Sequence, residues 1–194
     1  FYCPGYKTVE DRIIRCHKAG GHGSQTFVEG IKNSCNPVFM EIGARVGAER
    51  MYDYYKRLGL FNRTGIDLPG EANSIMHNLE NVGAVELATM SFGQSFQITP
   101  LQLLVAVSAV INGGTLVTPH FGLQVKAPDG RVVKTFEYKT SDNVISKETS
   151  ETMKKLLEAV VSDGTGKRAY LPGFRVGGKT ATSEKLPRRS GKYI

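Results

Sequence analysis

The residues best suited to chemistry lie near the end of the 194-residue chain, in residues 176–182. This run contains two glycines, which would let a ligand or another backbone approach closely. Lys179 follows them as a fixed cation. The alternation from Arg175 to Thr182 predicts a strand, on which Thr180 and Thr182 would share one face while Lys179 points to the other. We expect such a strand to face a ligand.

Residues 173–180 also satisfy the phosphate-binding loop pattern Gly-x-x-x-x-Gly-Lys-Ser/Thr. That loop needs a helix that begins at its lysine, here Lys179, with amides that cradle the phosphates. The following residues contain Pro187, Gly191 and several basic side chains, which do not favour a helix. A P-loop nucleotide-binding protein is therefore a remote alternative.

A second candidate group is Ser-Cys-Asn at residues 34–36, directly before Pro37. Asparagine caps free amides and proline tolerates the first helical turn, so this pair predicts a helix start. Gly47 would close that helix. The prediction places Ser34 and Asn36 at the N-terminal mouth of a helix, where a plain helix cap is the ordinary interpretation of Asn36.

The chain has three cysteines, an odd number with no Cys-x-x-Cys pair. Cys3, Cys16, His17 and His22 could together supply the ligands of a zinc site. Their spacing matches no common zinc finger or zinc ribbon, so we predict no metal and no cofactor. A disulfide between Cys16 and Cys35 is possible outside the cytoplasm, and it could hold the site inactive because Cys35 lies inside the Ser-Cys-Asn motif. Three buried unpaired thiols are the ordinary interpretation.

Composition and charge are those of a globular protein with many turns, with 40% hydrophobic and 22% charged residues, 22 glycines and 8 prolines. The longest nearly apolar run, residues 103–111, is far below the ~20 residues that span a bilayer. The net charge of +7 has its one basic cluster at residues 185–192. No aromatic residues alternate with that cluster, so we predict no nucleic-acid partner.

Caps and periodicity predict the remaining elements. Helices are expected over residues 27–32, 37–46, 48–58, 101–111 and 147–161, and strands over residues 9–16, 115–118, 123–126, 132–136 and 175–182. Residues 129–130, Asp-Gly, predict a hairpin turn in a three-stranded meander. The helix over residues 101–111 is apolar nearly all round, which predicts burial, and residues 61–81 should form a long loop.

Several stretches of the chain, in the same order, resemble the transpeptidase domain of class B penicillin-binding proteins, the enzymes that cross-link peptidoglycan. The stretches are residues 34–39, 42–43, 64–71, 86–89, 91–94, 99–102, 112–114 and 164–166. The Ser-x-Asn and Lys-Thr motifs are two of the three signatures of this group. The resemblance covers residues 1–194 as one partial domain. It implies an α/β (α+β) fold of the serine-transpeptidase and β-lactamase kind, with helices packed on an antiparallel sheet, present as a fragment.

The resemblance also implies roles for single residues. Ser34 would be the second active-site hydroxyl, and Asn36 the amide that contacts substrate. Lys179 would be the cation near that hydroxyl. Thr180 and Thr182 would bind the substrate carboxylate, and the Thr182 amide would form half of the oxyanion hole.

Two departures from the family pattern stand out. No lysine of the chain has a serine three residues before it, so the Ser-x-x-Lys nucleophile is absent from this sequence. The family places that serine N-terminal to the stretch that begins at Phe1, and we expect the chain to be a piece without activity of its own. Ala181 stands where the family usually has glycine, and its methyl group would narrow the site if it faced a ligand.

By this resemblance the parent protein would be a penicillin-binding peptidoglycan D,D-transpeptidase. Its partners would be a peptidoglycan stem peptide and β-lactams. It would be membrane-anchored at the extracytoplasmic face of the bacterial membrane, within a cell-wall synthesis complex for division, elongation or sporulation. The alternative is a non-catalytic binding or interaction module that keeps the same fold. A Ser-x-x-Lys within ~50 residues before Phe1 would support the enzyme, and its absence would support the module.

Overall fold

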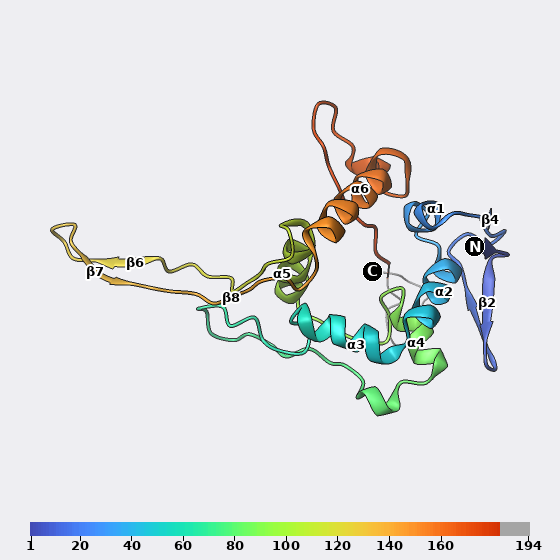
Figure 1. The fold of residues 1–194 in the computed structure, drawn as a ribbon, viewed down its shortest axis with the longest axis horizontal. Coiled ribbons are helices and arrows are strands. Elements are labelled where there is room, and N and C mark those ends of the chain that lie inside the picture. Colours follow the sequence, from blue (N-terminus) through green and yellow to red (C-terminus); the bar gives the residue numbers. More distant parts are fainter. Residues whose placement is uncertain (183–194) are drawn as a thin grey trace. The chain divides into compact units, whose positions relative to one another are not determined.

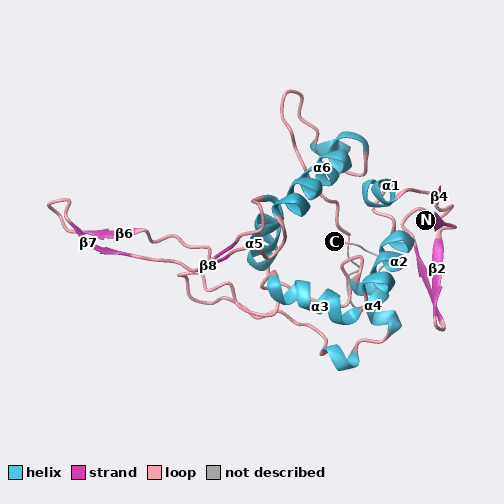
Figure 2. Cartoon of the chain, in the orientation of Figure 1, coloured by secondary structure: helices cyan, strands magenta, loops and turns pink. Residues whose placement is uncertain are grey.

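The computed structural model describes residues 1–182 (Figure 1). The basic cluster at residues 185–192 lies outside the described residues. The chain divides into two compact units. The first unit comprises Phe1–Met51, His77–Phe96 and Lys154–Ile194, and the second comprises Tyr52–Met76 and Gln97–Met153. Helices and two-stranded antiparallel sheets occur in the described part of both units, which confirms the α+β class (Figure 2).

The strands of the first unit form two antiparallel pairs. Strand β1 (Tyr2–Cys3) pairs with β4 (Gly23–Ser24). Strand β2 (Tyr6–Val9) pairs with β3 (Arg12–Arg15) in a hairpin. Strand β3 confirms a strand within the predicted range of residues 9–16, but the predicted start is wrong, because the chain reverses at Glu10, whose φ of 53° is a turn conformation.

The helices of the first unit follow their local capping signals. Helix α1 (Phe27–Lys32) begins with the predicted capping box of Thr26 and Glu29. Helix α2 (Asn36–Val46) ends at Gly47 as predicted, with φ 79°. Its N-cap residue is Cys35, without a side-chain cap, so the interpretation of Asn36 as the cap is wrong.

The first unit also contains helix α4 (Ala84–Met90), which our sequence analysis did not predict. Its N-cap is Gly83, whose amide donates to the Glu86 carboxylate at 3.1 Å. The second part of helix α6 (Lys147–Asp163) belongs to this unit as well, and it buries Leu156 and Val160. The short 3₁₀ helix η2 (Lys167–Ala169) follows α6.

Helix α3 (Ala48–Arg57) begins in the first unit and continues in the second from Tyr52 onward. The second unit also contains helix α5 (Pro100–Ile111). Helix α5 begins with the predicted capping box, in which Thr99 and Gln102 bond each other's backbone amides. Its predicted burial on all sides is wrong, because Leu103 and Leu104 are 52% and 62% exposed. The Gln102 side chain is buried instead and donates to the carbonyl of Asn62 at 2.8 Å.

The strands of the second unit form two further pairs. Strand β6 (Gln124–Lys126) and strand β7 (Val132–Thr135) form the predicted hairpin. Strand β5 (Leu116–Val117) pairs with β8 (Thr140–Ser141), so the predicted meander is wrong. The long loop after α3 is confirmed, with one bridge between Ile75 and Gln97 and the 3₁₀ helix η1 (Leu79–Asn81) at its end.

Residues 175–182 are not a strand, which corrects the prediction for the run with the chemical side chains. The run lies along helix α6. Arg175 forms an ion pair with Glu158, and the Gly178 amide donates to the Leu157 carbonyl at 3.1 Å. A backbone segment that hydrogen-bonds to a helix in this way is not paired with a neighbouring strand at those positions. The alternation in the sequence of residues 175–182 therefore did not indicate strand pairing.

Within residues 1–182, no helix combines the length and apolar character that crossing a membrane requires.

The close approach of α1 and α2 depends on Gly30. A Cβ at this position would lie 2.5 Å from Cγ1 of the buried Val38. Alanine favours a helix over glycine by about 1 kcal/mol, whereas overpacking a well-packed core costs about 1–3 kcal/mol. We therefore expect Gly30→Ala to lower the free energy of unfolding, measured by urea denaturation.

Gly20→Ala is the matched control, because no atom lies within 4 Å of a Cβ built there. It should leave the urea midpoint nearly unchanged. A Gly30→Ala protein as stable as this control would contradict close packing at Gly30.

Candidate functional site

The centre of the candidate site is the turn between helices α1 and α2, which carries Ser34. This residue has a φ of 50°, an uncommon conformation for a residue with a side chain. The Ser34 amide donates to the Ile31 carbonyl at 3.0 Å, and the Cys35 amide donates to the Gly30 carbonyl at 3.0 Å. These bonds at the end of α1 hold Ser34 in this conformation, and such outliers often occur at functional sites.

Lys179 meets Ser34 across 145 residues of sequence. Its ammonium donates to the Ser34 hydroxyl at 2.5 Å and to the Thr180 carbonyl at 3.0 Å. The same nitrogen lies 5.7 Å from the centroid of the Phe39 ring on α2, within cation–π range. Two motifs that are far apart in the sequence therefore lie in one site, and the resemblance had placed Lys179 near this hydroxyl.

The surroundings of Lys179 change its acidity. Part of the side chain reaches solvent, but desolvation by the surrounding protein lowers the pKa of Lys179 below the ordinary lysine value. A lysine with a lowered pKa can exchange a proton with a neighbouring hydroxyl more readily than an exposed lysine can. The Lys179–Ser34 pair is thus suited to move a proton as well as to bind an anion.

Thr180 lies beside a residue that the sequence analysis did not select. Its hydroxyl oxygen is 2.8 Å from that of Thr165, in the turn after α6. The Thr165 amide donates to the Lys32 carbonyl at the end of α1, at 3.0 Å. The Gly-Thr-Gly stretch at residues 164–166 was the available signal for Thr165. Thr182 is exposed, and the structure describes no contact that joins it to this group.

Asn36 has a partner of its own. Its side-chain amide donates to the Arg15 carbonyl at the end of β3, at 3.0 Å. Asn36 occupies the first position of α2, and this bond ties the helix start to the β2–β3 hairpin. Asn36 lies two residues from Ser34 and holds a fixed position, as a substrate-contacting amide requires.

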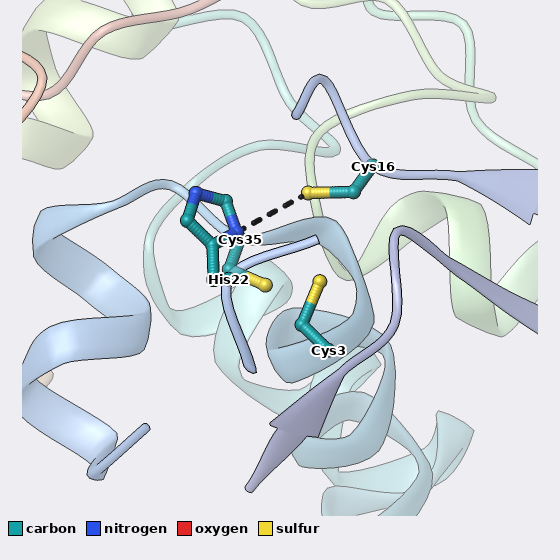
Figure 3. Close-up of side chains that lie close together, drawn as sticks. All are labelled: Cys3, Cys16, His22 and Cys35. Atoms are coloured by element: carbon teal, nitrogen blue, oxygen red, sulfur yellow. Dashed lines mark hydrogen bonds between the residues drawn. The ribbon is translucent and has the colours of Figure 1, made fainter. Parts of the chain in front are cut away.

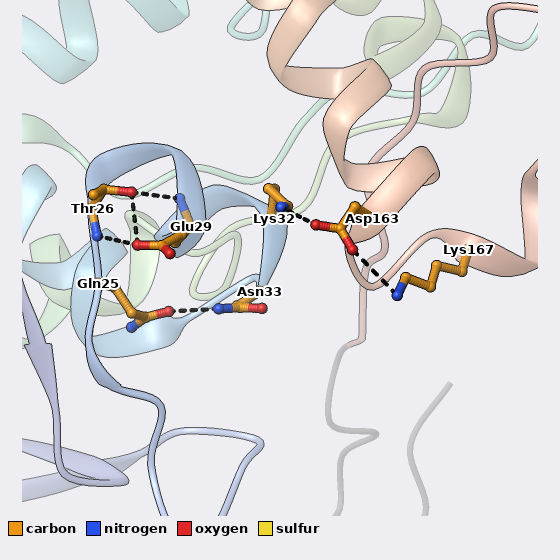
Figure 4. A network of polar contacts seen from close by, with 7 residues as sticks. All are labelled: Gln25, Thr26, Glu29, Lys32, Asn33, Asp163 and Lys167. Atoms are coloured by element: carbon orange, nitrogen blue, oxygen red, sulfur yellow. Dashed lines mark hydrogen bonds and ion pairs between the residues drawn. The ribbon is translucent and has the colours of Figure 1, made fainter.

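A network of polar side chains supports the Ser34 turn from both sides (Figure 4). On one side, Asn33 donates to the Gln25 side chain at 2.8 Å. On the other side, Lys32 and Lys167 form ion pairs with Asp163 at the end of α6. Hydrogen bonds from Lys32 and then from Lys167 hold the pKa of Asp163 below its ordinary value. The network thereby connects α1, which precedes Ser34, to the turn that carries Thr165.

A second group, which we call the thiol cluster, consists of Cys3, Cys16, His22 and Cys35 (Figure 3). The ligand atoms of these four side chains all lie within 4.8 Å of one another. All three thiols are buried and free, so the disulfide between Cys16 and Cys35 is not formed in this structure and stays a prediction. The zinc site considered from the sequence contained His17 in the place that Cys35 has in this cluster.

The protonation of the thiol cluster differs from residue to residue. Burial raises the pKa of the Cys35 thiol to about 12. Burial also acts to raise the pKa of Cys3, but hydrogen bonds from the backbone of His22 and Gly5 lower it overall. Burial, with the nearby His17 and Lys18, lowers the pKa of His22 and favours the neutral imidazole.

The phosphate-loop interpretation of residues 173–180 lacks its required geometry. Residues 179–182 are not helical, so Lys179 does not begin a helix. The element before the run is helix α6 with the short η2, where a P-loop needs a strand.

Comparison with known proteins identifies the family. The family model for the penicillin binding protein transpeptidase domain matches residues 1–194. Stage V sporulation protein D of Bacillus subtilis is 46% identical, over 100% of this chain and 30% of its own length. Penicillin-binding protein PbpB of Mycobacterium tuberculosis is 32% identical, over 93% of this chain and 28% of its own length.

Solved structures agree with the sequence relatives. Penicillin binding protein 3 of Mycobacterium tuberculosis, in its apo form, superimposes with a TM-score of 0.88 and 28% identity, over 100% of this chain and 45% of that one. The chain thus spans under a third of the length of these curated relatives and under half of this solved chain. The family match over all 194 residues confirms the resemblance, and the chain belongs to the penicillin-binding protein transpeptidase domains of class B.

Proposed function

We propose that this chain forms part of a peptidoglycan D,D-transpeptidase that works through an acyl-serine intermediate. The observation that carries the proposal is the 2.5 Å contact between the Lys179 ammonium and the Ser34 hydroxyl. It brings the Ser-x-Asn and Lys-Thr motifs, which are distant in sequence, to one place. The curated relatives named as D,D-transpeptidases support the same function.

The chain's own residues take the roles that their geometry allows. Ser34 and Lys179 relay a proton to and from the reacting groups, because their polar atoms are in contact and the pKa of Lys179 is lowered. Asn36 binds the amide of the substrate. Lys179 and Thr180, with Thr182, bind the substrate's terminal carboxylate, since a cation with adjacent hydroxyls forms strong hydrogen bonds to an anion.

The attacking serine belongs to a Ser-x-x-Lys motif, and this chain contains no such motif. That serine would attack the carbonyl of a peptidoglycan stem peptide and release the leaving amine, and a second amine would then take up the acyl group. We propose that the chain alone is inactive for this reason. A non-catalytic module with the same fold is the alternative, but the Lys179–Ser34 contact favours the enzyme.

We further propose that the protein binds β-lactams at this site. The homologous penicillin binding protein 3 has been solved in complex with ampicillin and with aztreonam, which supports this proposal. Membership of the same family supports three further proposals: location at the extracytoplasmic face of the bacterial membrane, membrane anchoring, and membership of a cell-wall synthesis complex. The 46% identity to stage V sporulation protein D favours a role in sporulation.

Removing the Lys179 ammonium should slow acylation. In the protein that carries this chain together with a Ser-x-x-Lys segment, we expect Lys179→Ala to lower the rate constant for fluorescent-penicillin labelling by about 10²–10³-fold. The control is Lys155→Ala, an exposed lysine on α6. Equal labelling rates for the two variants would contradict the role of Lys179.

The lowered pKa of Lys179 predicts a pH dependence. On the alkaline side its ammonium loses charge at a lower pH than an ordinary lysine does, so the labelling rate should fall through that lowered pKa. Lys179→Arg keeps its charge because the guanidinium pKa is above about 12. We therefore expect this alkaline decline to disappear in Lys179→Arg, measured as labelling rate against pH, and an unchanged decline would assign it to another group.

The 194-residue chain alone should show no covalent penicillin label that survives denaturation, because it lacks Ser-x-x-Lys. Intact mass after incubation with penicillin measures this directly. A stoichiometric adduct that one serine substitution abolishes would show that the nucleophile lies within this chain.

A further inference from the structure

We propose that the thiol cluster binds one zinc ion through three thiolates and one imidazole. The first support is geometric. In a tetrahedral site with Zn–S about 2.3 Å and Zn–N about 2.0 Å, a sulfur and a nitrogen ligand lie about 3.5 Å apart. The Cys16 sulfur and the His22 Nδ1 are 3.6 Å apart, and all four ligand atoms lie within 4.8 Å of one another. Only a small inward movement would complete the tetrahedron.

The backbone brings these four side chains together without help from an ion. Cys3 ends β1, and the His22 amide donates to its carbonyl at 3.1 Å. Cys16 directly follows β3, and its amide donates to the Gly5 carbonyl at 2.8 Å. Cys35 is the N-cap residue of α2 and makes no side-chain cap bond. The ligands thus come from four separate places that the local fold has already fixed.

The chemistry of the four groups selects zinc. Thiolate and imidazole are soft and borderline ligands, which favour zinc over magnesium or calcium. Three cysteines and one histidine form a closed structural set with no open position for substrate. Binding would release three protons, one from each thiol, and would leave the centre with a net charge of −1. The Gln25 amide, which donates to the Cys35 sulfur at 3.3 Å, would stabilise that negative charge.

The three cysteines of the thiol cluster form part of the hydrophobic core of the first unit. Cys3, Cys16 and Cys35 pack with Val38, and Phe1 and Ile42 lie against this group. These small thiol side chains bury little apolar surface, so a metal would supply stabilisation that larger side chains supply elsewhere.

The position of Cys35 gives such a metal a consequence for the candidate site. Cys35 lies between Ser34 and Asn36, so a metal bond to its sulfur would restrain the backbone on both sides. Ser34 sits in a left-handed conformation that the surrounding structure must maintain. A bound zinc ion would therefore hold Ser34 in reach of Lys179. The effect of this restraint on catalysis rests on the proposed function, whereas metal binding by the thiol cluster does not depend on that function.

The test measures zinc and cobalt binding by the purified, reduced protein. We expect one zinc per chain by elemental analysis and, after cobalt substitution, the strong absorption of a tetrahedral cobalt thiolate centre. Cys3→Ser and His22→Ala should lose the bound metal. The matched control is His17→Ala, whose ring lies 5.3 Å from that of His22 and which should keep one metal per chain.

A variant that fails to fold would not count against the proposal, so metal-dependent stability is measured beside content. The wild-type melting temperature should rise when zinc is added to the metal-free protein, and a folded His22→Ala protein should show no rise. Amide hydrogen exchange should slow at residues 33–39 on zinc addition and stay unchanged in the β6–β7 hairpin. Binding that His22→Ala leaves intact would overturn the proposal. So would zinc-free, fully reduced protein that takes up no cobalt.

Discussion

The hydrogen bond between Lys179 and Ser34 joins the two motifs of the candidate site, and it depends on other contacts that bring the same two parts of the chain together. It is 2.5 Å long and closes a loop of 145 residues. Closing a loop costs entropy that grows slowly with its length, so a single bond cannot hold it alone. The Lys32–Asp163 ion pair and the bond from the Thr165 amide to the Lys32 carbonyl bring the same two parts of the chain together. Lys179 and Ser34 therefore meet on a frame that other contacts have built.

That frame also constrains the turn between α1 and α2. The capping box fixes the start of α1, and Gly30 fixes its distance from α2. Ser34 then takes a conformation that most residues avoid. Isolated, this turn would relax. In the folded unit its neighbours on both sides hold it, which is how a strained residue at a functional site persists.

The sequence predicted the elements whose signals are local. Side chains within three or four residues make the caps at Thr26 and Thr99, and the structure confirms both. Helix α4 was missed because it is short and its N-cap, Gly83, carries no side-chain signal. The alternation of residues 175–182 indicated a strand, but whether an extended run pairs with another strand or lies on a helix is decided by distant residues.

The candidate site was predictable as a set of residues but not as a geometry. Motif resemblance selected Ser34 and Lys179 and placed the cation near the hydroxyl, whereas the 2.5 Å hydrogen bond between them is a finding of the structure. Thr165 was missed because its role depends on Thr180, 15 residues away. The thiol cluster shows the same limit. Spacing rules for zinc sites assume ligands from one hairpin or helix, whereas these four ligands come from places that only folding brings together.

The ion pair between Lys32 and Asp163 also limits which insertions and deletions the chain can accept between Thr26 and Asn36. A helix turns by about 100° for each residue, so one residue inserted into α1 would rotate Lys32 away from Asp163. The same insertion would move Ser34 off the end of the helix that supports it. Among related proteins the stretch from Thr26 to Asn36 should therefore keep a constant number of residues, while the loop between β6 and β7, which has no such constraint, can change in length.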